Sequence, residues 1–137
     1  MAGNEAVIVE LLGNKGEVVD MTTADATAIS KGTLLKLSDA RMVGLVTGAG
    51  DAFAGIAVAD KEGSDGATNI GVYTKGIFDL YTSGAAIIAG ELVMMSGANE
   101  IGLATAAAIS GGAIVGKALE TTAAGVEEWI EVAVGVY

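Results

Sequence analysis

The sequence contains a long internal match, in which one strand-like pattern occurs twice in the same order. Residues Ala28–Ser38 align with Ala86–Ser96 at an offset of 58, from position 28 to position 86. Further along, Phe53–Ala57 aligns with Ile114–Ala118 at an offset of 61, from position 53 to position 114. Self-similarity at a nearly fixed period is typical of repeated architectures, so the chain is predicted to contain two copies of one structural unit.

Short apolar segments bounded by glycine and polar residues make up both copies. The segment Thr68–Thr74 alternates apolar and polar residues, and the C-terminal run 126–137 places Ile130, Val132 and Val134 on one face with Trp129 on the other. Such alternation is typical of half-buried strands. Long helical periodicity is missing, and the alanine-rich stretch 104–109 could form either a short helix or part of a strand and turn.

We therefore predict an all-β fold, a small sandwich or barrel built from two similar halves with at most one short helix. The pseudo-repeats are placed at about 28–80 and 86–136. Between the apolar segments 41–47 and 53–59, the turn residues Gly48–Asp51 predict a hairpin-like connection.

The composition favours one domain whose core consists of small aliphatic side chains. The chain has 137 residues, of which 52% are hydrophobic but only 4% are aromatic. Small side chains bury less apolar area per residue, which gives a lone monomer less stabilisation. We take this as a reason to expect oligomerisation or docking on a larger partner.

The charge disfavours nucleic acid as a partner, and no segment favours a membrane. The net charge is −10 and the seven basic residues are scattered, so no basic patch is present to neutralise phosphates. The longest uncharged run, between Glu100 and Lys117, is short for a membrane span and contains four glycines. The N-terminus lacks the basic start and long apolar core of a signal peptide.

The absence of cysteine and histidine removes most common catalytic and metal-binding systems. Nucleophile systems built on Ser-His or Cys-His pairs are excluded, and so is the most common transition-metal ligand. We predict no catalytic residue, no cofactor and no metal site. The carboxylates Asp60, Glu62 and Asp65 could form a Ca²⁺ loop, but a solvated loop is the favoured interpretation.

One short string has a possible catalytic interpretation. Residues Val46–Gly55 resemble the signature of ribokinase-like sugar kinases, whose Gly-Ala-Gly-Asp turn opens a helix that holds a phosphoryl group. That resemblance would make Asp51 the catalytic base and Gly48–Gly50 the anion hole. Here the sequence after the turn has the pattern of a strand, without a long amphipathic helix, so the kinase interpretation stays a remote alternative.

A longer resemblance covers most of residues 28–137. A Gly-Ile-Ala strand at 53–60, a polar loop, an alternating strand at 68–74 and a Lys-Gly turn before Ile77–Leu80 follow one another. This order resembles the head decoration (capsid cement) proteins of tailed phages, including the lambda-type proteins and their longer prophage relatives. The segments 28–37 and 116–119 resemble the flanking parts of that family. The chain is longer than the lambda-type proteins and lacks their proline-rich start.

The resemblance implies a β-tulip fold and a homotrimer that binds the major capsid protein at three-fold and quasi-three-fold sites. It also implies an N-terminal arm, here residues 1–12, that adds a strand to the capsid protein, followed by one β-rich domain over 13–137. The interface residues that we predict are Ala6, Val7, Ile8, Val9 and Leu11 in the arm, with Trp129 and Tyr137 as weaker candidates.

We thus expect a virion structural protein without enzymatic activity, made in the host cytoplasm and located on the outer surface of the head. It would stabilise an icosahedral capsid and bind neither nucleic acid nor membrane. The alternatives are a β-rich tail, fibre or other surface assembly module, a self-assembling β protein of cellular origin, and the kinase that uses Asp51.

Overall fold

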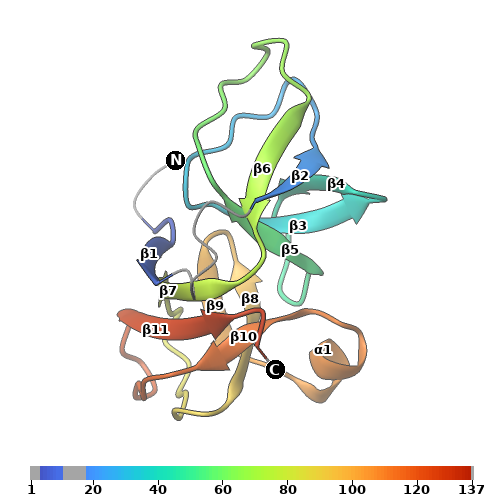
Figure 1. The fold of residues 1–137 in the computed structure, drawn as a ribbon. Coiled ribbons are helices and arrows are strands. Elements are labelled where there is room, and N and C mark those ends of the chain that lie inside the picture. The colour runs from blue at the N-terminus through green and yellow to red at the C-terminus, as the bar shows by residue number, and fades with distance from the viewer. Residues whose placement is uncertain (1–3, 11–17, 137) are drawn as a thin grey trace.

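Two layers of β structure make up the chain, a closed barrel and a six-stranded sheet below it in the view of Figure 1. The computed structural model describes residues 4–10 and 18–136. The barrel has the strand order β2-β4-β3-β5-β6 and the sheet has the order β1-β7-β11-β10-β8-β9. The strands are β1 (Val7–Glu10), β2 (Val19–Thr22), β3 (Leu34–Asp39), β4 (Met42–Leu45), β5 (Phe53–Ala57), β6 (Asn69–Tyr73), β7 (Gly76–Tyr81), β8 (Leu92–Gly97), β9 (Glu100–Leu103), β10 (Ile114–Ala118) and β11 (Trp129–Val134).

The prediction of an all-β fold with at most one short helix is confirmed. That helix, α1 (Ala106–Ser110), is capped by Thr105, whose hydroxyl accepts the N–H of Ala108. A short polar side chain at this position satisfies one of the amide groups that a first helical turn leaves unpaired. The alanine-rich stretch therefore forms the helix and not a strand.

The two halves are similar down to the pairing of individual residues. Strands β3 and β4 pair in the same register as β8 and β9, shifted by 58 positions, and both pairs end in a bulge. The equivalent pairs are Leu35↔Leu45 with Val93↔Leu103, Lys36↔Gly44 with Met94↔Gly102, Leu37↔Val43 with Met95↔Ile101, and Asp39↔Met42 with Gly97↔Glu100. The bridge between Ile29 and Lys61 has its counterpart between Ile87 and Thr122.

The halves differ in how their sheets end. In the barrel, β2 lies between β6 and β4, and its parallel pairing with β4 closes the sheet. By position along the chain β7 is the counterpart of β2, but it lies between β11 and β1. Among the described residues, the one strand pairing between the end of β7 and β9 is an isolated parallel bridge between Thr82 and Ile101. The chain passes from barrel to sheet between Tyr73 and Gly76, upstream of the predicted junction between the copies.

The hairpin predicted at residues 48–51 is wrong. Strands β4 and β5 both pair with β3, on opposite edges, so the turn between them carries the chain across the end of β3. The error has a plain cause, because a hairpin and such a crossing present the same local pattern of two apolar segments around a turn.

A continuous core joins barrel and sheet. Leu34 and Ile56 of the barrel pack in one buried cluster with Phe78, Leu80 and other side chains of the sheet. A second cluster fills the barrel itself.

A buried polar contact also crosses from barrel to sheet. The side-chain oxygen of Asn99, in the turn after β8, accepts the N–H of Leu34 at 2.9 Å. Asn99 adopts a φ of 57° and is 5% exposed, whereas Arg41 has a φ of 50° at the equivalent turn of the barrel but is exposed. The contact therefore fixes the relative position of the two halves without a match in the other copy.

Candidate interaction surface

The first strand forms one edge of the six-stranded sheet. Within the described residues, β1 has a neighbouring strand on one side only, namely β7. Val7 lies opposite Asp79, and Ile8 lies opposite Phe78. Val9 is the extra residue of a bulge, because Glu10 pairs with Ile77, the next residue along β7. Bulges are common at sheet edges, where they bend the strand and change the direction of its side chains.

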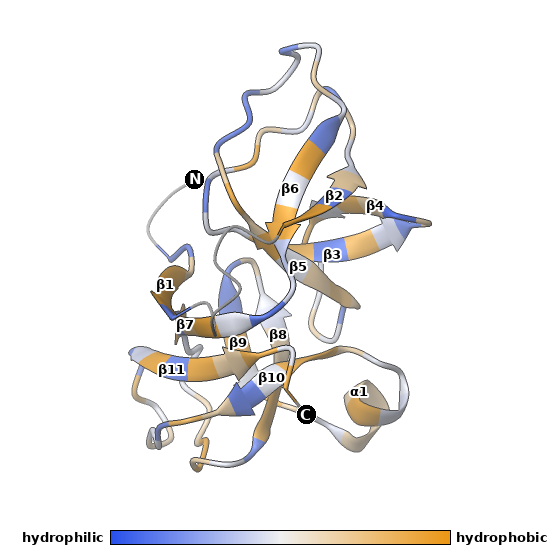
Figure 2. Cartoon of the chain, in the orientation of Figure 1, coloured by the Kyte–Doolittle hydropathy of each residue, from blue (hydrophilic) through white to orange (hydrophobic). Residues whose placement is uncertain are grey.

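The side chains of β1 are apolar but only half covered. The exposed fractions are 52% for Val7, 38% for Ile8 and 45% for Val9. Figure 2 shows β1 as a mostly hydrophobic strand at the edge of the molecule. A row of exposed β-branched residues on an edge strand is an unusual feature for a monomer in water, and it marks a surface that another chain can cover.

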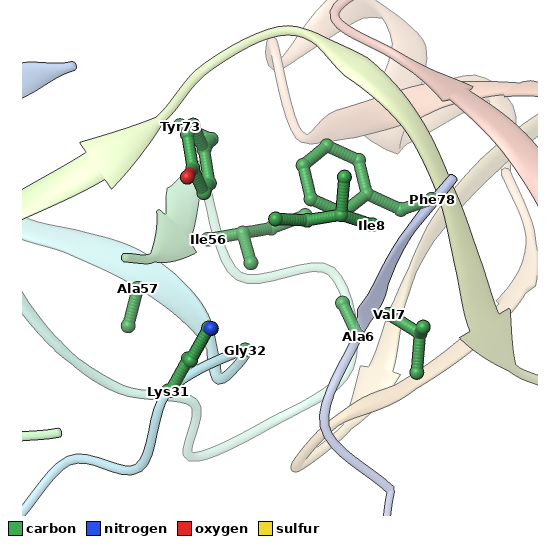
Figure 3. Close-up of a pocket in the computed structure, with 9 residues that line it drawn as sticks. All are labelled: Ala6, Val7, Ile8, Lys31, Gly32, Ile56, Ala57, Tyr73 and Phe78. Carbon is green, nitrogen blue, oxygen red and sulfur yellow. The ribbon is translucent and has the colours of Figure 1, made fainter. Parts of the chain in front are cut away.

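A cavity of about 330 Å³ lies between β1, β7 and the barrel. Figure 3 shows the side chains of Ile8 and Phe78 close together at one end, with the ring of Tyr73 and the side chain of Ile56 beside them. Its lining is mostly apolar and consists of Ala6, Val7, Ile8, Lys31, Gly32, Ile56, Ala57, Tyr73 and Phe78. With Lys31 as its one charged side chain, this cavity suits an apolar group better than a polar substrate.

The start of β1 is attached to the barrel at Gly32. The N–H of Ala6 donates to the carbonyl of Gly32 at 2.7 Å. Gly32 has a φ of 87°, and a Cβ there would lie 2.6 Å from the Ala6 carbonyl oxygen. Only glycine fits this position, because of both the conformation and the close approach. Its counterpart in the other half, Gly90, also has a positive φ but has nothing within 4 Å of its Cβ position.

Trp129 lies on the same face of the sheet as Val7. Directly opposed residues of antiparallel strands point to the same side, which places Val7 with Asp79 and Trp129 with Tyr81. Asp79 and Tyr81 are two residues apart on β7, so all four side chains point to one face. Trp129 is 38% exposed and packs edge-to-face against Tyr81, with 5.4 Å between ring centres. The structure thus brings together two residues predicted from distant parts of the sequence.

Acidic residues predominate on this face around Trp129, and the basic residue Lys117 lies further along it, opposite Ala133. Asp79 and Glu131 lie directly opposite each other, and the Tyr81 hydroxyl donates to Glu127 at 3.2 Å. Partial desolvation, followed by the hydrogen bond and charge of Glu127, raises the pKa of Tyr81 above its ordinary value. In the part of the chain that the structure describes, no basic side chain forms an ion pair with Asp79 or Glu131. Like charges in direct opposition favour a positively charged partner.

Two of the predicted interface residues cannot be placed. Leu11 and Tyr137 lie outside the described residues, and their role stays a prediction. Ala6 is half-buried beside Gly32, and the remaining four are the exposed residues Val7, Ile8, Val9 and Trp129.

The structure gives Asp51 a role in its own turn. Its carboxylate accepts the N–H groups of Thr47 and Gly48 at 2.9 and 3.1 Å and lies 3.6 Å from the Lys36 ammonium. The Thr47 amide is the main cause that lowers the pKa of Asp51. These amides are occupied, and the chain continues as strand β5 where a phosphate-binding site needs a helix. The arrangement supports a structural role for Asp51.

The acidic loop at 60–65 surrounds a lysine. The ammonium of Lys61, whose side chain is 3% exposed, donates to the carbonyls of Asp25, Thr27 and Glu62 at 2.7 to 3.1 Å and lies 3.3 Å from Asp65. Asp65 also accepts the Ala67 N–H, the main cause that lowers its pKa. Across residues 4–10 and 18–136, no three acidic side chains are grouped as a metal site requires. The Lys61 ammonium provides the positive charge to which these oxygens bind.

Comparison with known protein families decides the broader identity. A family model described as phage cement protein matches residues 13–136, nearly the whole chain. The chain belongs to the phage cement protein family. No curated protein matches the sequence. Membership confirms the resemblance found in the sequence, and it makes the chain a structural protein associated with the capsid of the phage head.

The family is one of structural proteins, which favours a role without catalysis. Among the described residues, no helix is long and apolar enough to span a membrane. Sequence reasoning missed the cavity beneath β1 and the role of Gly32, because their parts come from five separate segments of the chain. The unequal contacts of Gly32 and Gly90 have no signal in the repeat itself, since both positions read as glycine.

Proposed function

We propose that this cement protein binds the major capsid protein on the outer surface of the head, at three-fold and quasi-three-fold sites, as a homotrimer. The contact would be made by β1 and by the sheet face that carries Val7 and Trp129. The observation that carries the proposal is an apolar edge strand with exposed side chains in a member of the phage cement protein family.

The outer edge of β1 suits strand addition. An edge strand offers backbone N–H and C=O groups that an extended segment of another protein can pair with, while exposed side chains provide selectivity. Val7 and Val9 provide that apolar surface, and the cavity beneath β1 offers space for one apolar side chain of the partner.

The acidic face supports a partner with basic groups. Asp79 and Glu131 would be neutralised by lysine or arginine side chains of the shell, and an indole such as Trp129 also attracts cations. A trimer would combine three such contacts, so that modest individual contacts give tight overall binding.

The first test is co-sedimentation of the purified protein with empty, expanded shells of its phage. Saturable binding at multiples of three copies per site supports the proposal. Deletion of residues 1–12 is expected to abolish binding while the far-ultraviolet circular dichroism spectrum keeps its β signature. Retained binding would exclude β1 as the contact. An intact protein that does not bind any shell would favour the tail or fibre alternative.

Point variants give a sharper comparison. Val7→Asp and Trp129→Ala are expected to weaken binding at least tenfold, because burying an unpaired carboxylate or losing an interface tryptophan typically costs more than about 1.4 kcal/mol. Ile109→Asp is the matched control, since Ile109 is 51% exposed but lies on α1, at the other side of the sheet in Figure 1. Equal loss in all three variants would count against a localised surface.

A further inference from the structure

Strand β1 covers an edge that the repeat itself leaves open. In the barrel, the corresponding edge of β2 is covered by β4, and the N–H of Thr22 donates to the carbonyl of Arg41 at 2.8 Å. In the sheet, β9 reaches only the end of β7, through the bridge at Thr82. Residues 77–79 of β7 pair instead with β1, a segment that precedes both copies in sequence.

This pairing depends on the backbone far more than on side chains of β1. All four residues of β1 are exposed, and none belongs to a buried core cluster. The cavity of about 330 Å³ beneath the strand shows that β1 does not fill the space between itself and the barrel, whereas protein cores usually leave few voids larger than a water molecule. Little in this contact requires that β1 and β7 belong to the same chain.

From these observations we infer that β7 is a strand-acceptor site at which β1 is exchanged with a second copy of this chain. The same register, Val7 opposite Asp79 and Ile8 opposite Phe78, would then form between subunits. Exchange of an identical element is a low-cost route to oligomers, because the new contact repeats the old one. Head-to-tail exchange closes into a ring, which provides a contact for the proposed homotrimer, and the inference rests on that oligomeric state.

The chain length permits this exchange. Eight residues, 11–18, separate Glu10 from Val19, and a connection of that length can span up to roughly 30 Å when extended. Pairing also joins residues 7 and 79, which are far apart in sequence, so β1 docks after both halves have formed. At that stage the β1 of a neighbouring copy competes on equal terms, above all where copies are concentrated on one shell site. The outer edge of β1 stays available to the capsid protein in either arrangement.

The absence of cysteine in the natural sequence allows a direct test. The full-length double variant Val7→Cys/Asp79→Cys is linked with a short bis-maleimide, in dilute solution, in concentrated solution and after binding to shells. A link within one chain leaves a monomer on a denaturing gel, whereas exchange produces covalent dimers and trimers. We expect a shift from monomer to covalent trimer as concentration rises or shells are added.

Two controls separate the possible outcomes. Val7→Cys/Ile109→Cys places the second thiol on α1, away from the β7 edge, and is expected to give no covalent trimer. Light scattering measures the oligomeric state independently of the link. A trimer whose chains carry only internal links would overturn the exchange and leave the proposed function intact. A monomer with internal links in solution and on shells would overturn both the exchange and the proposed trimer. If the thiol at position 7 is linked to the capsid protein and not to the thiol at position 79, the exchange would also be overturned. That result would mean that β1 pairs with the capsid protein.

Discussion

The contact between Asn99 and Leu34 gives the sharpest stability prediction, because the repeat provides its own control. We expect Asn99→Gly to lower the free energy of unfolding by about 1–3 kcal/mol, the usual cost of leaving a buried donor without its partner. Glycine adopts the φ of 57° at this turn without strain, so the change removes the side-chain hydrogen bonds to Leu34 and Glu5 and keeps the turn.

Arg41→Gly is the matched control. It removes a side chain at the equivalent turn, with a φ of 50°, but Arg41 is exposed and its guanidinium donates to the exposed carbonyl of Asp20. Surface substitutions of this kind usually change stability by less than about 0.5 kcal/mol. The difference between the two variants therefore measures what the Asn99 side chain contributes through both of its hydrogen bonds, because its Nδ2 also donates to the Glu5 carboxylate at 3.5 Å.

The assay is urea unfolding followed by circular dichroism, with hydrogen exchange at the Leu34 amide as a local readout. The slope of the transition should stay constant, since the surface exposed on unfolding hardly changes. Two results would refute the role of this hydrogen bond in holding the halves together. One is an Asn99→Gly variant no less stable than Arg41→Gly, and the other is a Leu34 amide that exchanges in Asn99→Gly at the rate of the unmodified protein.

Three further predictions concern other parts of the molecule. Lys61→Met should destabilise the protein by about 1.5–3 kcal/mol, because it removes charge-assisted hydrogen bonds to the partly buried carbonyls of Asp25 and Thr27. Lys75→Met at an exposed position should have little effect in the same urea assay. Because folding lowers the pKa of Asp51, its carboxylate contributes stability that is complete above the unfolded pKa near 3.8 and is lost as the pH falls through the folded pKa. Asp51→Asn should therefore lose less stability on acid titration than the unmodified protein. Identical acid profiles of the two proteins would contradict this prediction. Shell binding should weaken with rising salt, as expected for exposed charges, and a binding constant independent of salt would argue against a basic partner.

Close packing at Gly32 can be tested by comparison with Gly90. Gly32→Ala should speed hydrogen exchange at the Ala6 amide, because the new methyl group meets the Ala6 carbonyl, and should also weaken shell binding. Gly90→Ala shares the strain of a positive φ, but its methyl group meets no neighbour, so the Ala6 amide should exchange at the rate of the unmodified protein. Equal exchange rates in the two variants would show that β1 is not held at Gly32.

The strands and the repeat could be predicted from the sequence because both are local patterns. The alternation around Trp129 gave the buried side of β11 correctly, with Ile130, Val132 and Val134 in the core. The nearly equal offsets of 58 and 61 predicted two similar units, and β3–β4 and β8–β9 do pair in one shared register.

Pairing between distant strands could not be predicted in the same way. The crossing from β4 to β5 looks like a hairpin in sequence, and nothing near residue 7 indicates that its partner is residue 79. The partner of an edge strand depends on which edges the rest of the fold leaves open, and that is settled only after both halves have formed. For the same reason the sequence could nominate Val7 and Trp129 separately but could not place them on one face.

The position of Trp129 has a spectroscopic consequence. It is the one tryptophan of the chain, and it is partly exposed on the outer face of β11 instead of lying in the core. Its fluorescence should therefore change only modestly when the protein unfolds in denaturant. Contact with a shell that covers this face would remove water from the indole and shift its emission to shorter wavelength. The natural chain thus carries an optical probe that responds more to docking than to folding.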